Sequence, residues 1–271
     1  MIVGWIYHHD LDPFILRFTE GIGLRWYGLA YVLGFLAGYW LLTNYLVGKR
    51  VQLTNEEAGD FVLTVAIAGV VGGRFGYVFL YGMEYFMRDP FYLFAVWEGG
   101  MSIHGGVVGA VLGIVWFARS YEVSFWKLSD AAAFGTPPGL FFGRIANFIN
   151  GELWGRPTGG DWGVVFPAAD NLPRHPSQLY EAVLEGPVLF GLLVLIMRYT
   201  DEDGYTSGGF LVGYGVLRFL VEFYRAPDPH IGYEILGMTR GQEYSILFVL
   251  LGILLLPPIR RVFFGSRREV R

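Results

Sequence analysis

The sequence predicts an all-α polytopic membrane protein. Hydrophobic residues make up 54% of its 271 positions and charged residues only 16%, whereas a soluble domain carries roughly 25% charged residues. The chain also holds 39 glycines, about twice the usual share. Apolar segments recur along its whole length. These three features together indicate a helical bundle whose solvent is mostly lipid.

Seven segments are candidates for membrane-spanning helices, each of which needs about 20 mostly apolar residues. The shorter ones need their flanking residues to cross the full thickness. The segments are 26–47, 61–81, 104–118, 131–149, 179–199, 210–223 and 244–256. We expect a single integral-membrane domain over residues 1–271 with about seven transmembrane helices. Residues 151–177, rich in Gly, Pro and Trp, are expected to form a small outer cap.

Basic residues favour an orientation with the N-terminus outside and the C-terminus in the cytoplasm. In that orientation ten basic residues lie in inside loops and seven in outside loops, and cytoplasmic loops carry an excess of Lys and Arg. Half of the ten lie in the C-terminal tail: Arg260, Arg261, Arg267, Arg268 and Arg271.

Charge and cysteine content exclude several functions. The net charge of −4 leaves no broad basic surface, so we expect no nucleic-acid partner. The chain has no cysteine, which excludes disulfides, thiolate metal sites and a cysteine nucleophile.

Glycines four residues apart predict close helix packing, because small residues on one helix face let backbones approach. Examples are the pairs Gly34/Gly38 and Gly105/Gly109. In contrast, Pro137-Pro138 predicts a break or kink in the fourth segment, because proline removes an internal hydrogen bond.

Ionisable residues at membrane depth are costly and therefore mark candidate functional sites. They are Arg74, His104, Arg144, Glu181, Glu185, Arg218 and Glu222. The densest polar cluster is residues 143–155. There Arg144 and Asn147 are three apart and share one helix face, and Asn150 and Glu152 follow where the helix should end.

This cluster resembles the signature of the bacterial prolipoprotein diacylglyceryl transferases, roughly G-R-x-x-N-F-x-N-x-E-x-x-G. Every fixed position is filled, by Gly143, Arg144, Asn147, Phe148, Asn150, Glu152 and Gly155. Other segments, at 25–29, 72–77, 99–106, 174–181 and 218–223, are similar to that family in the same order. The resemblance spans about residues 10–256. It departs at Arg25, where some members have histidine, and in a cap after Gly155 that looks short.

The resemblance implies an activity and its partners. The family transfers a diacylglyceryl group from phosphatidylglycerol to the lipobox cysteine thiol of a preprolipoprotein signal peptide, forming a thioether and releasing glycerol 1-phosphate. It implies a multi-pass protein of the bacterial plasma (inner) membrane, in contact with the lipid bilayer and with its active site toward the outer leaflet. It implies no cofactor and no metal.

The resemblance also implies roles for individual residues. His104 would be the base, since histidine titrates near neutral pH. Arg144 and Arg218 would clamp the phosphodiester, and Glu222 would orient Arg218 or simply neutralise it. The remaining candidates would contact substrate or support the site; they are Tyr27, Asn147, Asn150, Glu152, Gly155 and Arg74. Arg74 would bind a second lipid head or pair with Glu181, with a supporting role preferred.

Three other functions remain as alternatives. An anionic-solute transporter would have two related halves with matching broken helices, which the sequence lacks. A membrane hydrolase or protease is disfavoured because neither G-x-S-x-G nor H-E-x-x-H occurs. A non-catalytic lipid-binding subunit would bind phosphatidylglycerol without releasing glycerol phosphate.

Overall fold

The computed structural model describes residues 4–19, 22–95, 99–227 and 237–264. The chain divides into two compact units, which are residues 1–38 with 132–271 (unit 1) and residues 39–131 (unit 2). Helices predominate in both units, which confirms the predicted helical class. The described residues add two small two-stranded sheets, which the hydropathy pattern does not predict because each strand has only three to six residues.

Unit 2 is built on two long helices, α2 (Asn55–Tyr81) and α4 (Ile103–Ser120). They approach through glycines, since a Cβ on Gly72 would lie 2.4 Å from the Gly105 carbonyl oxygen and 2.7 Å from Gly109 Cα. This contact confirms the packing predicted from the four-residue glycine spacing. Shorter elements complete the unit: a π-helical turn at Leu42–Leu46, α3 (Met83–Arg88) and a 3-10 turn at Pro90–Phe94.

Unit 1 holds the C-terminal helices. One continuous helical run comprises α6 (Ser177–Val183), a π-helical turn (Leu184–Val188) and α7 (Leu189–Tyr199). It is followed by α8 (Tyr205–Val221), α9 (Arg240–Leu255) and α10 (Pro257–Phe264). Glycines again allow close contact, because a Cβ on Gly252 would lie 2.8 Å from the Gly208 carbonyl oxygen.

Two further helices, α1 (Trp26–Leu41) and α5 (Phe125–Ile149), continue from one unit into the other. Helix α5 is unbroken through Pro137 and Pro138, so a break at this pair is not observed. Proline pairs are tolerated inside membrane helices because side chains such as Thr re-satisfy nearby carbonyls. Here Thr136 Oγ1 donates to the Ala132 carbonyl over 2.7 Å, one residue before the carbonyls of Ala133 and Phe134, which lose their helical partners at Pro137 and Pro138.

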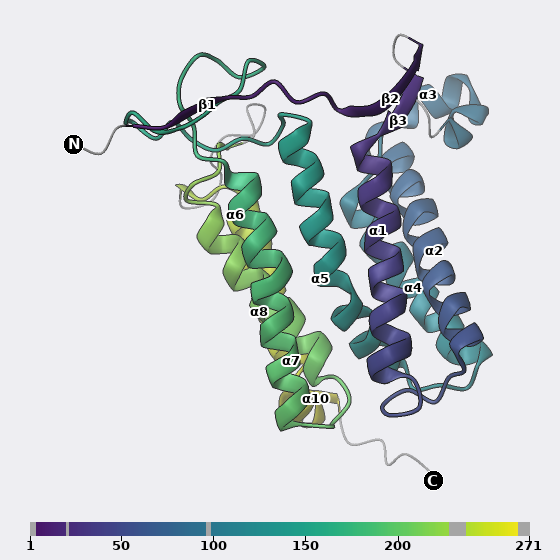
Figure 1. Cartoon of the computed structure of the whole chain (residues 1–271). Coiled ribbons are helices and arrows are strands. Elements are labelled where there is room, and N and C mark those ends of the chain that lie inside the picture. The colour runs from purple at the N-terminus through teal and green to yellow at the C-terminus, as the bar shows by residue number, and fades with distance from the viewer. Residues whose placement is uncertain (1–3, 20–21, 96–98, 228–236, 265–271) are drawn as a thin grey trace. The chain divides into compact units, whose positions relative to one another are not determined.

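The N-terminal strands lie at one end of unit 1. Strand β1 (Ile6–His8) pairs in parallel with β4 (Gly163–Val165) of the 151–177 segment. Strands β2 (Phe14–Thr19) and β3 (Ile22–Arg25) form an antiparallel pair that leads into α1. Figure 1 shows β1 near the end of α5 and the start of α6, with α10 at the opposite end of unit 1. The end of unit 1 that holds β1 therefore serves as a reference for the positions of the site residues on α5, α6 and α8.

Four helices among the described residues are long and apolar enough to cross a membrane: Trp26–Leu46, Asn55–Tyr81, Ile103–Ser120 and Ser177–Tyr199. The chain is therefore a multi-pass helical membrane protein. The other three predicted segments coincide with α5, α8 and α9. Of these, α8 and α9 have 17 and 16 residues, which is shorter than a full bilayer crossing normally requires.

Candidate functional site

Arg144 on α5 and Arg218 on α8 share two buried carboxylates. Arg144 Nε donates to Glu185 Oε2 over 2.9 Å, and its Nη1 lies 3.1 Å from Glu181 Oε2. Arg218 Nη1 donates to the other oxygen of Glu181. Since Glu181 and Glu185 are four residues apart, they lie on one face of the α6 run. The structure therefore brings together the two arginines that the sequence places on separate helices.

Two more charged residues extend this arginine–glutamate cluster. Arg218 Nη2 lies 2.8 Å from Glu222 Oε2, and Arg225 Nη1 donates to Glu181 Oε1 over 3.2 Å. The cluster thus contains three arginines and three glutamates, which balance formally. Burial of so many charges would be strongly unfavourable if the charges were not paired with charges of the opposite sign.

The arginines are the accessible part of the cluster. The Arg144 and Arg218 side chains are 16% and 12% exposed, whereas those of Glu181 and Glu185 are 0% exposed. The carboxylates therefore lie behind the guanidinium groups. Each guanidinium has five N–H donors in a rigid fork, which is more than its carboxylate contacts occupy, and both groups are partly exposed.

A hydrogen-bonded row of polar side chains is formed by the end of α5 and the start of α1. The Asn147 amide donates to the Tyr27 hydroxyl and, over 2.9 Å, to Glu152 Oε1. Asn150 Nδ2 lies 3.5 Å from that same oxygen, and Gln178 Nε2 donates to the Glu152 carbonyl over 2.6 Å. Four of the predicted site residues, Tyr27, Asn147, Asn150 and Glu152, therefore meet.

Two acceptors in this row are buried and lack a hydrogen-bond partner within the described part of the chain. They are Asn150 Oδ1 and Gln178 Oε1. A buried unpartnered acceptor is costly and calls for a donor such as a water or a ligand hydroxyl.

The turn after α5 contacts His9 of the N-terminal segment and continues into the tightly packed segment 151–177. His9 is buried, and its Nε2 lies 2.7 Å from the Phe148 carbonyl oxygen. Gly151 adopts φ +65° beside the His9 ring, a conformation that favours glycine. Gly155 packs on backbone, because a Cβ there would lie 2.4 Å from the His175 carbonyl oxygen and 2.7 Å from that of Tyr224. The contacts of Gly155 thus describe a packing role.

In the segment 151–177, which lies outside the spanning helices, two groups have shifted pKa values. Hydrogen bonds from Arg174 lower the pKa of Asp170, and Arg174 also donates to the Gly155 carbonyl over 2.9 Å. Burial lowers the pKa of His175, whose ring packs on Trp162 and Tyr224. Its Nδ1 lies 3.2 Å from the Tyr180 hydroxyl, so these contacts describe a structural histidine at the start of α6.

Arg74 and His104 belong to unit 2. Arg74 is buried in α2 and donates to four backbone carbonyls of its own unit, those of Tyr92, Leu93, Gly99 and Gly100. These bonds favour the supporting role over lipid binding, and the carboxylate of Glu181 is taken by arginines of unit 1. His104 is exposed in the first turn of α4, whose N-cap is Ser102. This is the helix start that the sequence predicts for it.

Arg225 and Tyr214 were not predicted from the sequence, and Glu185 was predicted only as an ionisable residue at membrane depth, without a role. No local signal in the sequence marks Arg225, because it lies beyond the end of α8 at Val221 and resembles a loop residue. Tyr214 lies one turn before Arg218 and interacts electrostatically with Glu185 and Arg144. The Tyr214 ring itself packs on Phe210 and Phe248.

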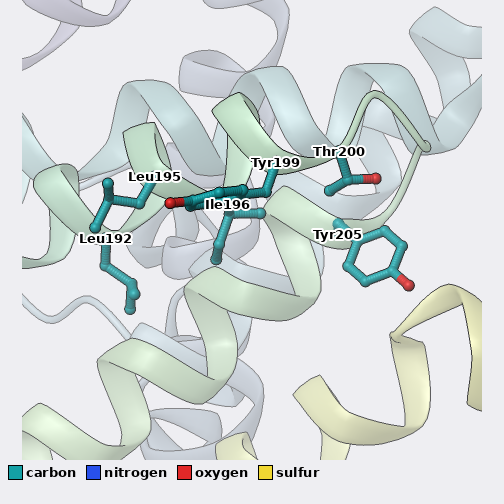
Figure 2. Close-up of a pocket in the computed structure, with 6 residues that line it drawn as sticks. All are labelled: Leu192, Leu195, Ile196, Tyr199, Thr200 and Tyr205. Atoms are coloured by element: carbon teal, nitrogen blue, oxygen red, sulfur yellow. The ribbon is translucent and has the colours of Figure 1, made fainter.

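A separate hollow of about 610 Å³ lies on α7 and α8. Its lining is mostly apolar with two tyrosines, as Figure 2 shows: Leu192, Leu195, Ile196, Tyr199, Thr200 and Tyr205. None of the predicted site residues lines this hollow, so the hollow is not part of the candidate site.

The fold and the site define a helical membrane protein whose buried arginines suit an anionic group. The sequence profile of the prolipoprotein diacylglyceryl transferase family matches residues 13–257. The chain belongs to this family, which confirms the resemblance and makes it a transferase.

Curated relatives agree along nearly the whole length. The chain is 47% identical over 260 residues to the phosphatidylglycerol--prolipoprotein diacylglyceryl transferase of Pseudoalteromonas atlantica, covering 94% of this chain and 92% of the relative. It is 46% identical over 262 residues to that of Pasteurella multocida, with 96% of both covered. The enzyme of Geobacter sulfurreducens is 44% identical over 243 residues, covering 90% and 93%.

Proposed function

We propose that this chain transfers the diacylglyceryl group of phosphatidylglycerol to a cysteine thiol of a prolipoprotein, the first step of lipoprotein maturation. Its membership of the transferase family supports the reaction. The carbon–oxygen bond to the phosphate breaks, a carbon–sulfur bond forms, the thiol proton passes to a base, and glycerol 1-phosphate leaves. Since this chain has no cysteine, the sulfur comes from the substrate.

The observation that carries the proposal is the shared pairing of Arg144 and Arg218 with Glu181. A leaving phosphate monoester gains negative charge in the transition state, and preorganised cations stabilise that charge. The buried carboxylates fix the two guanidinium groups in advance. The donors on their accessible side then bind the phosphate oxygens, and arginine pairs with phosphate bidentately.

The polar row of Tyr27, Asn147, Asn150 and Glu152 would bind the glycerol head group. Hydroxyl groups donate to acceptors, and the row holds a carboxylate. Asn150 Oδ1 and Gln178 Oε1, which have no hydrogen-bond partner among the described residues, add two buried acceptors. A diol satisfies such acceptors, whereas a choline or ethanolamine head does not supply the same pair of hydroxyls.

His104 would remove the thiol proton. The nucleophile is a thiolate, and a neutral histidine accepts a proton near pH 7. His104 lies in the first turn of α4, where its side chain is exposed and is therefore accessible to a thiol.

We further infer about seven membrane crossings, with the N-terminus outside and the basic C-terminus in the cytoplasm of a bacterial inner membrane. The basic tail supports this orientation. The polar row at the β1 end of unit 1 would then face the outer leaflet, where the cap over residues 151–177 meets the lipobox of the signal peptide.

A transfer assay tests the function. Purified protein in phosphatidylglycerol vesicles is mixed with a peptide carrying a lipobox cysteine, and products are resolved by mass spectrometry. We expect a diacylglyceryl thioether on the cysteine peptide and none on a matched serine peptide. Absence of the thioether with properly folded protein would contradict the proposal, and lipid binding without transfer would favour a lipid-binding subunit.

A further inference from the structure

The carboxylate of Glu222 is held from two sides. On one side Arg218 Nη2 lies 2.8 Å from Glu222 Oε2. On the other side Thr239 Oγ1 donates to Glu222 Oε1 over 3.1 Å. All of this lies in the interior, since Glu222 is 4% exposed and Thr239 is 3% exposed.

The Thr239 hydroxyl has a second bond, because Thr239 is the N-cap of α9. Its Oγ1 accepts from the Gln242 backbone N–H over 3.3 Å, and the Thr239 backbone N–H donates to Gln242 Oε1 over 3.1 Å. One hydroxyl therefore caps a helix as acceptor and holds a carboxylate as donor. The position of Glu222 is tied to the first turn of α9.

Gly241 brings this first turn against the carboxylate. A Cβ at this position would lie 2.5 Å from Glu222 Oε1 and 2.8 Å from Oε2. Only a residue without a side chain allows that approach.

We propose that Thr239 and Gly241 are positioning residues for the transfer reaction, which fix Glu222 and through it the guanidinium of Arg218. This inference rests on the proposed role of Arg218 at the phosphate. Arg218 is then anchored at Nη1 by Glu181 and at Nη2 by Glu222, which fixes the plane of its fork. Loss of Glu222 as the second anchor leaves the positive charge of Arg218 in place but allows its guanidinium group to rotate.

Substitutions at Thr239 separate capping from positioning. Thr239→Ser keeps both bonds. Thr239→Asp keeps the cap, because aspartate is a strong N-cap residue, but sets a second carboxylate against Glu222. Thr239→Val keeps the shape and loses both bonds. The matched control is Thr54→Val, since Thr54 has the same capping box with Glu57 on α2 and its hydroxyl bonds within that turn.

We expect Thr239→Asp and Thr239→Val to lower kcat/KM for phosphatidylglycerol at least about tenfold, with the loss mainly in kcat, because an anchor effective in the transition state is removed. Thr239→Ser should restore the rate to within about twofold. Thr54→Val should lower the melting temperature through the loss of its cap and keep its kcat/KM. Thr239→Asp at full activity would overturn the proposal.

Gly241→Ala gives an independent readout, with Gly191→Ala as its control, because a Cβ on Gly191 meets nothing described within 4 Å. We expect the first to lose at least about tenfold in kcat/KM and the second to keep it. In a Glu222→Gln background, Thr239→Asp should cost less than about twofold more, since contacting residues are not additive. An undiminished tenfold loss in that background would refute action through Glu222.

Arg218→Lys in the same assay separates a failure of the proposed phosphate role of Arg218 from a failure of the positioning role of Thr239 and Gly241. If Arg218→Lys is fully active, the phosphate role of Arg218 is wrong and the proposed function fails at this residue. If Arg218→Lys is impaired while folded Thr239→Asp and Gly241→Ala are fully active, only the positioning role fails.

Discussion

Arg144 and Arg218 bind opposite oxygens of one buried carboxylate, that of Glu181. Arg144 comes from α5 and Arg218 from α8, and Glu181 lies between them on α6. The two guanidinium groups are therefore held in a fixed relation before any lipid arrives. Preorganisation of this kind costs nothing when charge develops in the reaction.

The fork of Arg144, and not only its charge, should matter. Arg144→Lys keeps one positive charge but cannot bind Glu185 and Glu181 in the same plane. We expect transfer to fall at least about tenfold, roughly 1.4 kcal/mol in the barrier, in the vesicle assay. Arg88→Lys is the control, because Arg88 forms an exposed pair with Glu84 and should leave the rate unchanged. Equal activity of Arg144→Lys and wild type would remove the bidentate role.

Glu181 should contribute strongly to stability because it is the one carboxylate that contacts all three arginines of the cluster. Glu181→Gln leaves buried guanidinium groups without their common anion, and breaking a buried pair costs about 3–5 kcal/mol. We expect a large drop in the melting temperature in detergent.

The matched control for Glu181 is Glu84→Gln. Its pair with Arg88 is 75% and 73% exposed, and such pairs contribute about 0–1 kcal/mol. If both glutamine variants melt alike, the cluster does not stabilise the fold.

The presence of the helices and the polar run 143–155 could be predicted from the sequence, because both follow from patterns of neighbouring residues. The periodic apolar segments mark helices, and the spacing of Arg144 and Asn147 places them on one face. The unbroken α5 could not be predicted, since proline breaks a helix unless nearby groups satisfy the freed carbonyls, and those groups depend on the fold.

The partners of each charge could not be predicted, because they depend on which helices pack together. Glu181 was a possible partner of Arg74 by charge alone, yet the structure pairs it with Arg144, Arg218 and Arg225. Arg225 follows α8 and looks like a loop residue in the sequence. Only the packing of α6 beside α8 brings it to Glu181.

His104→Gln tests the base. Glutamine keeps a hydrogen-bonding side chain of similar length but cannot take up a proton, and general-base catalysis contributes typically 10²–10⁴-fold. We expect transfer to fall by at least about 100-fold with an unchanged melting temperature. His8→Gln is the control, because His8 is also exposed but is not one of the predicted site residues. A near-normal rate for His104→Gln would eliminate it as the base.

His175 should make the protein less stable in mild acid. Burial lowers the pKa of His175 in the folded protein, while histidine in the unfolded chain keeps a pKa of about 6.5. As the pH falls through about 6.5, the unfolded chain therefore binds the proton first, and the free energy of unfolding decreases. The decrease continues until the pH reaches the lower pKa of the folded state. Above about 6.5 the contribution is fully present.

Thermal unfolding of wild type and His175→Gln at pH 7.5 and pH 5.5 measures this contribution. Other groups titrate in both proteins, so the quantity to compare is the change in melting temperature between the two pH values. We expect a smaller change for His175→Gln, because glutamine does not titrate, and the wild-type change for His8→Gln. If His175→Gln and wild type shift equally, burial of His175 does not couple protonation to unfolding, since a linked group must contribute to the pH dependence.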